Sequence, residues 1–565
     1  MPTISITRKD LEQLLGRAVS LKQLDAWLPW VKGEFKGVDA ATGAWRIELQ
    51  DSNRPDLWCC EGLARQIRAK LEGRAGSYPF FKPGKGLTRR IEVAAGLEPV
   101  RPYVAACAAR GAPMSADALA QFIQTQEKLA DIYGRKRRTV SIGLYRLAPI
   151  KFPVAYTLVR PDEVRFTPLG FEEPLSLGEI LTRHPKGQEY GPILSGHERL
   201  PLLRDHAGQV LSFPPIINSR DIGEVQVHDR DLLIEVTGTD VFMVVLTLNI
   251  FAVNLADRGA SIEPVEIVYP YATPLGKRFA TPLDFGKPKA TPLKAIEAAL
   301  GETLPPRDIQ EALVSYGHTV TLSRGKVSVK PPPYRQDLMH AVDVVEDVAI
   351  SRGYDRFAPI MPSQFTVGGL SRVEVLSDRM RDSMVGLGFQ EIISNILVSR
   401  ADLVDRMRLA GTERDHLVEV DNVMSQTYSC LRQWMLPSLL RVESGSSREF
   451  YPHRLFEVGE VAVLDVEAEL GSRTLTVLGA LIAHATANFS EAHTALDVLL
   501  YYLDCPYVLE PLPHPSFLEG RGGLILSQDR PIGFIGELHP EVLEQWEITM
   551  PAVAFELDLS ALAER

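Results

Sequence analysis

One stretch, residues 331–354, constrains the local fold of this chain more than any other. Its sequence is PPPYRQDLMHAVDVVEDVAISRGY. Three prolines followed by Tyr334 cannot lie inside a helix, so we expect an extended lead-in, and residues 338–352 then have helical composition up to Gly353. The stretch therefore predicts a helix with a defined start and a defined end.

The predicted helix has two different faces. At about 100° per residue, five apolar side chains fall on one arc: Ala341, Val342, Val345, Val348 and Ala349. The opposite arc holds Asp343, Glu346 and Asp347. Ile350 projects into this acidic arc, one turn beyond Glu346, so we expect the acidic face to be partly covered.

The acidic residues of this stretch have two alternative roles. There are four of them: Asp337, Asp343, Glu346 and Asp347. Carboxylates this close together repel one another and lose hydration unless a cation or a basic partner neutralises them. A set of oxygen ligands without His or Cys suits Mg²⁺. The alternative is a solvated acidic face that pairs with Arg335 and Arg352, and the residues alone leave both roles open.

Two motifs resemble one known family. The stretch from residue 332 to 355 resembles the signature of the B5 domain in phenylalanine–tRNA ligase beta subunits, and NRPDLWCCEGLAR at residues 53–65 resembles a motif near the N-terminus of the same subunits. The second motif alone indicates only a proline turn before a helix that starts near Leu57. The resemblance implies that Asp337, Asp343, Glu346 and Asp347 hold Mg²⁺ at a site shared with the alpha subunit.

Composition restricts the class of protein. A chain of 565 residues is too long for one core and predicts three or four domains. It has no run of 18 apolar residues and no signal peptide, so we expect a cytoplasmic protein that does not enter membranes. A net charge of −11 argues against bulk coating of nucleic acid but not against local RNA contact. The five cysteines form no CxxC pair and indicate neither a zinc site nor a disulfide framework.

The order of elements and the resemblance together predict a multidomain α+β protein. Four domains are expected: an N-terminal α/β module at 1–80, a β-rich B3/B4 editing domain at 81–270, a winged-helix-like B5 domain at 271–360 and a class II synthetase-like core at 361–565. The last is expected to be an antiparallel sheet with helices. The short length favours the archaeal and eukaryotic type of the subunit.

Small polar residues in the strands of the second domain indicate a pocket. These are Ser212, Asn218, Thr237 and Thr239. They fit a small polar ligand or ordinary hydrogen bonds at strand ends, and the pattern alone favours the second. The segments HPKG, LSFPPIIN and VTGTD resemble the B3/B4 domain, which implies a hydrolytic pocket at Leu203, Ser212 and Thr237. Glu235 stands where archaeal-type relatives usually have Asp.

The basic run at 134–138, GRKRR, is more typical of a solvated surface than of an RNA contact.

The class II-like core is predicted to be catalytically silent. Adenylate formation needs arginines on the phosphates of ATP. In RLFEVGE, Arg454 stands three residues before Glu457 rather than two, so the two side chains would face opposite ways on a strand. Glu537 and His539 occupy the region where a late arginine is expected, and no GxxxxGK[ST] loop is present.

These features predict a function through the resemblance. The chain would be the beta subunit in an α2β2 heterotetramer, in which the alpha subunit uses ATP to attach phenylalanine to tRNA(Phe) and the beta subunit hydrolyses mischarged Tyr-tRNA. The alternative is a non-editing metal-binding scaffold or an RNA-binding relative. A two-metal hydrolase built on the four acids is excluded because His340 is the only base near them.

Overall fold

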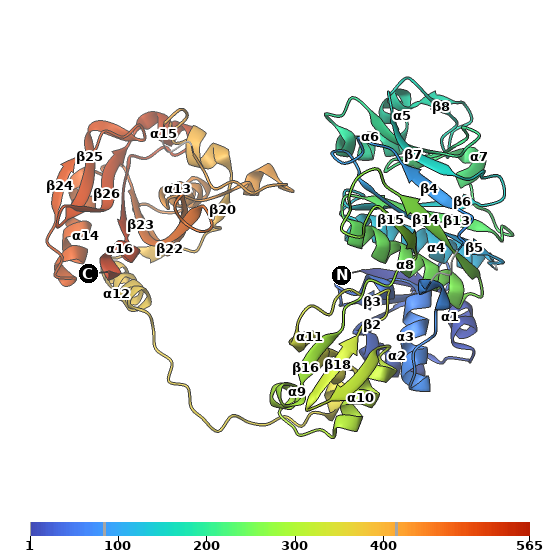
Figure 1. Ribbon diagram of the computed structural model, residues 1–565. Coiled ribbons are helices and arrows are strands. Elements are labelled where there is room, and N and C mark those ends of the chain that lie inside the picture. The colour runs from blue at the N-terminus through green and yellow to red at the C-terminus, as the bar shows by residue number, and fades with distance from the viewer. Residues whose placement is uncertain (1, 83–85, 113, 413–415, 565) are drawn as a thin grey trace. The chain divides into compact units, whose positions relative to one another are not determined.

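The computed structural model describes residues 2–82, 86–112, 114–412 and 416–564. The chain divides at residue 360 into two compact units (Figure 1). No helix in these described ranges has the length and apolarity that crossing a bilayer requires. All five cysteines are buried.

A small sheet with three helices opens the first unit. Its elements are β1 (Thr3–Ile6), α1 (Arg8–Leu15), α2 (Leu21–Trp27), β2 (Gly33–Val38), β3 (Trp45–Leu49) and α3 (Cys60–Glu72), with strand order β1-β3-β2. Ser20 and Gln23 form a capping box at α2. The helix expected from Leu57 begins instead at Cys60, because Pro55–Leu57 forms a 3₁₀ turn.

A ten-stranded sheet forms the centre of the first unit. Its strands are β4 (Arg90–Val93), β5 (Tyr103–Arg110), β6 (Val140–Arg146), β7 (Val154–Val159), β10 (Leu200–Arg204), β11 (Val210–Phe213), β12 (Ile217–Asn218), β13 (Leu232–Gly238), β14 (Ser261–Val268) and β15 (Arg278–Thr281). The order is β12-β11-β10-β7-β4-β14-β5-β13-β6, and β15 pairs with β14. The sheet thus extends past residue 270, where we expected a domain boundary, because the β14–β15 pairing holds residues 278–281 in it.

Helices cover this sheet and complete its core. They are α4 (Ala116–Lys128), α5 (Leu177–Arg183), α6 (Pro185–Tyr190), α7 (Arg220–Gly223) and α8 (Val241–Asp257), and a short pair of strands, β8 (Arg165–Phe166) and β9 (Leu175–Ser176), lies beside them. Helix α8 packs against β5 and β13 and is buried along most of its length. An apolar helix of this kind is typical of a protein core.

The acidic helix belongs to a third group of elements in the first unit. These are β16 (Lys289–Pro292), α9 (Leu293–Leu300), α10 (Pro306–Ser315), β17 (Thr319–Ser323), β18 (Lys326–Lys330) and α11 (Ala341–Arg352), with strand order β16-β18-β17. Helix α11 begins three residues later than expected. Val342 is 63% exposed, whereas Asp347 is only 4% exposed. The buried face is rotated from the predicted one because Val344, Val345 and Val348 pack against the strands and α10.

The second unit is a seven-stranded sheet with helices on both faces. Its principal elements are α12 (Arg372–Gly386), β19 (Gln390–Glu391), α13 (Leu436–Gly445), β22 (His453–Leu464), β23 (Ser472–Ala483), α14 (Phe489–Tyr502), β24 (Val508–Pro511), β25 (Phe517–Ser527), β26 (Arg530–Leu538), α15 (Pro540–Gln545), β27 (Ala552–Asp558) and α16 (Leu559–Ala563). The order is β19-β22-β23-β27-β26-β25-β24, antiparallel except between β19 and β22. A separate pair, β20 (Leu397–Val398) and β21 (Cys430–Leu431), lies outside it.

Side chains of alternate residues of β27 enter two cores. Val553, Phe555 and Leu557 pack with α12, α14 and α16, whereas Ala552 and Ala554 pack with α13 and α15. This alternation is the period of two that a strand between two helical layers requires. The second unit is therefore the antiparallel sheet with helices that the sequence predicts.

Candidate functional site

A cavity of about 360 Å³ lies beside the large sheet of the first unit, within the range of small-molecule pockets. Residues of α4, β6, β11, β12 and β13 line it. Two of the predicted site residues, Ser212 on β11 and Glu235 on β13, are among these lining residues, together with Asn218. Ser212 and Glu235 are each only 2% exposed, so the cavity places two buried polar side chains where a ligand would be enclosed.

A buried tyrosine joins Ser212 to Glu235. The Tyr145 hydroxyl oxygen lies 2.8 Å from Ser212 Oγ and 2.8 Å from Glu235 Oε2. Tyr145 is on β6, next to β13, and is fully buried. The second carboxylate oxygen, Glu235 Oε1, has no hydrogen-bond partner among the described residues. This acceptor is therefore buried without a partner among the described residues.

The pocket disfavours the charged form of Glu235. Burial raises the pKa of Glu235 to about 7, although the hydrogen bond from Tyr145 and the charge of Arg101 favour the carboxylate. The Thr237 hydroxyl also favours the carboxylate, but its close contacts are with Arg101 and Ser141. Glu235 therefore changes its charge near neutral pH.

The other two predicted pocket residues lie behind the wall. Leu203 is opposite Ser212 in the strand pairing and is fully buried in the apolar cluster around Tyr145. Thr237 accepts a hydrogen bond from Arg101 Nε at 3.0 Å, and its backbone carbonyl accepts one from Arg101 Nη2 at 2.7 Å. Neither Leu203 nor Thr237 is among the described residues that line the cavity. They support the wall rather than face a ligand.

Arg101 also holds the basic run at 134–138. Its Nη1 donates hydrogen bonds to the carbonyl oxygens of Arg137 and Arg138 at 3.1 and 3.3 Å. Arg135, Lys136 and Arg137 have φ of 48°, 53° and 64°, a left-handed turn that residues with a Cβ rarely adopt. Arg137 lines the cavity and donates hydrogen bonds to the carbonyl oxygens of residues 215 and 216 at 3.0 and 2.8 Å. The turn is thus fixed at the edge of the pocket.

Among the acids predicted to bind Mg²⁺, Asp337 and Asp347 are already neutralised by the chain itself. Arg335 donates to Asp337 at 3.0 and 2.5 Å and lies 2.9 Å from Asp347, and His318 Nε2 lies 2.6 Å from Asp347. Burial is the largest single influence and opposes ionisation of both carboxyls, but the charge of Arg335, the hydrogen bonds from Arg335 or His318 and the charge of Arg54 together hold the pKa of Asp337 and Asp347 below the usual 3.8. These two carboxylates do not fit a magnesium cage in this chain.

Asp343 and Glu346 have partners other than Arg335. Asp343 accepts hydrogen bonds from the backbone N–H groups of Met339 and His340 at 2.6 and 2.5 Å, at the start of α11. Glu346 forms an ion pair with Lys32, which also contacts Asp51. Both acids are half-buried. The described residues contain no group of three His, Cys, Asp or Glu side chains arranged to hold a metal.

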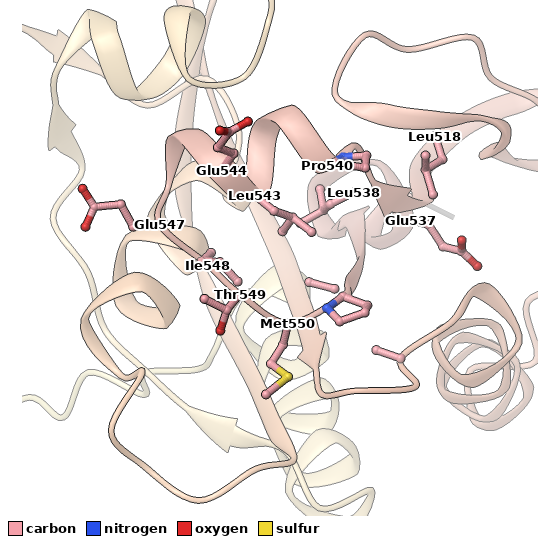
Figure 2. Close-up of a pocket in the computed structure, with 13 residues that line it drawn as sticks. Leu518, Glu537, Leu538, Pro540, Leu543, Glu544, Glu547, Ile548, Thr549 and Met550 are labelled. Atoms are coloured by element: carbon pink, nitrogen blue, oxygen red, sulfur yellow. The ribbon is translucent and has the colours of Figure 1, made fainter.

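A second cavity, of about 680 Å³, lies in the second unit (Figure 2). Apolar side chains such as Leu538, Leu543 and Met550 line it, with Glu537, Glu544 and Glu547 at their edge. Its described lining contains carboxylates but no Lys or Arg. Three carboxylates would repel a triphosphate, so this cavity does not suit ATP.

The arginine of the strand motif is also engaged elsewhere. Arg454 pairs with Glu491 of α14 at 2.8 Å, whereas Glu457 pairs with the buried Arg432 at 2.9 Å. The two residues of the motif therefore have different partners. This arrangement agrees with the expectation that they face opposite ways on β22.

Three residues at or behind the cavity wall escaped prediction: Gly143, Tyr145 and Arg101. A Cβ atom on Gly143 would lie 2.0 Å from the Tyr145 hydroxyl and 2.7 Å from Glu235 Oε2. Glycine inside the strand segment TVSIGLY was the available signal, because a glycine within a strand often marks a close approach of another group. Arg101 had no such signal, since its partners lie on β13 and in the basic turn.

Comparisons with known proteins identify relatives of this chain. The model of the phenylalanyl tRNA synthetase beta chain CLM domain matches residues 358–559, and that of the tRNA synthetase B5 domain matches residues 290–354. A phenylalanine–tRNA ligase beta subunit of Treponema pallidum is 41% identical over 92% of this chain and 86% of its own length. One of Pyrococcus horikoshii is 37% identical over the full length of both chains.

A solved structure is similar to part of this chain. It is an N-terminal fragment of the phenylalanyl-tRNA synthetase beta subunit from Pyrococcus horikoshii, with 36% identity and a TM-score of 0.59, and the match covers 62% of this chain and 100% of the fragment. Bacterial and archaeal relatives thus agree with each other and with the two domain models. The chain belongs to the phenylalanine–tRNA ligase beta subunit family.

Proposed function

We propose that this chain removes tyrosine that has been attached in error to tRNA(Phe), in the pocket of Ser212 and Glu235. The observation that carries the proposal is a cavity of about 360 Å³ in which these two buried side chains are held together by Tyr145 and one carboxylate oxygen remains unpaired. An enclosed cavity with a few polar groups on an otherwise apolar wall is typical of a site for one small group.

The unpaired oxygen gives a physical reason for selecting tyrosine. The phenol hydroxyl of a tyrosyl group can donate to Glu235 Oε1, whereas a phenylalanyl group would leave this buried acceptor unpaired. A site that hydrogen-bonds a substrate hydroxyl rejects the analogue without it by a factor on the order of 10⁴ to 10⁵. Glu235 has one more methylene than the aspartate usual in archaeal-type relatives, so it reaches further into the cavity.

We propose that the basic turn guides the tRNA end to this pocket. Arg135, Lys136 and Arg138 are exposed, and Arg137 lines the cavity. Basic side chains bind the sugar-phosphate backbone without reading sequence, which suits a site that receives the same 3′ end each time. The rigid left-handed turn keeps these charges at one edge of the pocket.

Attachment of phenylalanine is proposed to occur in an alpha subunit that uses ATP. The larger cavity of the second unit has no Lys or Arg in its described lining, and Arg441, which lines a smaller cavity there, pairs with Asp402. The second unit exposes large apolar side chains, including Ile393 at 93%, Phe450 at 98% and Tyr501 at 80%. Exposed apolar groups of this size favour coverage by a partner. We therefore expect an α2β2 heterotetramer in the cytoplasm, with phenylalanine and ATP bound through the alpha subunit.

A magnesium ion near α11 would involve Asp343 and Glu346. Mg²⁺ binds few carboxylates and keeps several waters, so two protein oxygens from this chain are compatible with it. Asp337 and Asp347 would contribute only by releasing Arg335, which their burial makes costly. The ligand set expected from the resemblance is therefore proposed here in reduced form.

A charging assay on the complex with the alpha subunit tests the editing proposal. Ser212→Ala or Glu235→Ala should let tyrosyl-tRNA accumulate in the presence of ATP, tyrosine and tRNA(Phe), while the rate of phenylalanine attachment stays at the parental level. Ser219→Ala is the matched control, because Ser219 is also 2% exposed but does not line the cavity. Deacylation of tyrosyl-tRNA at the parental rate by both pocket variants would refute the assignment and favour a non-editing scaffold.

A further inference from the structure

Tyr145 is fully buried behind the cavity and contacts two of the polar side chains that line it. Tyr145 is absent from the described lining, yet its hydroxyl is within hydrogen-bond distance of both Ser212 and Glu235. The hydroxyl has one proton and two lone pairs, so it can donate to only one of these neighbours at a time. The direction of one hydrogen bond therefore determines the direction of the other.

We propose that Tyr145 is a positioning residue that couples the hydrogen-bonding direction of Ser212 to the ionisation of Glu235, an inference that rests on the proposed editing function. When Glu235 is ionised, Tyr145 donates to Oε2 and accepts from the Ser212 hydroxyl. Ser212 then presents only lone pairs to the cavity, beside the unpaired Oε1.

The opposite arrangement follows when Glu235 is protonated on Oε2. Its proton is donated to the Tyr145 oxygen, Tyr145 donates to Ser212, and the Ser212 proton becomes free to point into the cavity. The ionised state offers two acceptors to a tyrosyl ester, which carries a phenol hydroxyl and an ammonium group as donors. A phenylalanyl ester has only the ammonium group, so the ionised state selects tyrosine more strongly.

The backbone of β6 leaves space for the Tyr145 hydroxyl but not for an additional methyl group at residue 143. Gly143 lies opposite Glu235 in the pairing of β6 with β13. A methyl group at this position would come within 2.0 Å of the Tyr145 hydroxyl. Contacts below 3 Å of this kind force a shift, so the hydrogen bonds of Tyr145 require glycine at residue 143.

Several other charged or titratable groups face this site and belong in any account of its pH dependence. Arg101 acts electrostatically on Glu235 from the buried side, whereas Tyr156 is not among the groups that shift the pKa of Glu235. Five charged groups of the described lining act from the cavity side: Glu127, Asp131, Arg137, Lys186 and Glu224, and the phenol of Tyr190 belongs to the same lining. None of these is within hydrogen-bond distance of Glu235 in the described contacts, so Tyr145 is the group whose removal should act on it most directly.

The test is the pH profile of tyrosyl-tRNA deacylation by the whole complex without ATP. Tyr145→Phe removes one hydroxyl and keeps the ring. Because the lost hydrogen bond favours the carboxylate, the midpoint of the profile should move upward by about one pH unit, the equivalent of one hydrogen bond to a charged group. Gly143→Ala should move the midpoint in the same direction while keeping the hydroxyl, and it serves if Tyr145→Phe fails to assemble.

Tyr156→Phe is the matched control. Tyr156 is equally buried on the same sheet, and its hydroxyl donates to the carbonyl oxygen of Arg101 at 2.9 Å. Its profile should match the parent, and phenylalanine attachment should be normal in all variants. An unchanged midpoint in Tyr145→Phe, or an equal shift in Tyr156→Phe, would overturn the inference about Tyr145. The proposed function would be unaffected as long as the parent complex hydrolyses tyrosyl-tRNA. If the parent complex leaves tyrosyl-tRNA intact, the proposed function itself fails and the inference fails with it.

Discussion

Replacing Glu235 with glutamine should remove a pH-dependent loss of stability from the first unit. Burial raises the pKa of Glu235 from its ordinary 4.5 to about 7. The folded state therefore binds the proton more tightly than the unfolded state. The stability that the group contributes is fully present below pH 4.5 and is lost as the pH rises through about 7.

The size of this effect follows from the pKa interval. At ~1.4 kcal/mol for each pKa unit, the interval corresponds to roughly 3 kcal/mol of unfolding free energy between pH 4.5 and pH 8. Glutamine keeps an oxygen that accepts from Tyr145 but carries no charge. Glu235→Gln should therefore gain stability relative to the parent as the pH rises, whatever constant packing difference the substitution introduces.

Unfolding of the full chain at a series of pH values measures this difference. Because the chain has two compact units, the readout is the pH dependence of each separate transition rather than one global value. Glu127→Gln is the control, since Glu127 is an exposed carboxylate on the lining of the same cavity. Parallel pH curves for the parent and Glu235→Gln would refute the claim that the pocket holds a destabilised carboxylate.

Three further predictions concern other parts of the chain. Asp347→Asn should destabilise the first unit by about 3–5 kcal/mol with or without Mg²⁺, because it leaves Arg335 with less neutralising charge. Asp343→Asn should instead weaken Mg²⁺ binding. Equal responses of the two variants to Mg²⁺ in thermal unfolding would contradict this. Replacing Lys136 and Arg138 with Ala should raise the KM for tyrosyl-tRNA and reduce the salt dependence of deacylation, and an unchanged salt slope would argue against phosphate contact. The isolated chain should catalyse no phenylalanine-dependent pyrophosphate exchange and should restore charging when mixed with the alpha subunit, and exchange at the rate of the complex would place a catalytic site in residues 361–565.

Local patterns in the sequence predicted the bounds of helices better than they predicted contacts between distant residues. Proline and glycine punctuation predicted α11 to within three residues at its start and correctly at its end, because those residues act through their own backbone. Its buried face was predicted less well. Asp347 was placed on an acidic face that we expected to be partly covered, but the sequence did not predict that His318, 29 residues earlier in the chain, and Arg335 neutralise it in the interior.

The pocket shows the same limit. Ser212 and Glu235 were expected to share a site only through resemblance, and the residue that joins them is 67 positions from one and 90 from the other. Alternation along β13 places Glu235 and Thr237 on one face, but only the strand order determines that Thr237 contacts Arg101 instead of the cavity. Neither strand order nor these pairings can be derived from local periodicity.

Deacylation of preformed aminoacyl-tRNA is the most direct test of the account. The complex of this chain with its alpha subunit is mixed with Tyr-tRNA(Phe) or Phe-tRNA(Phe) in the absence of ATP, so that no recharging occurs. The account predicts rapid release of tyrosine, little release of phenylalanine, and loss of tyrosine release in Glu235→Ala. Equal hydrolysis of the two substrates, or full activity in Glu235→Ala, would contradict it.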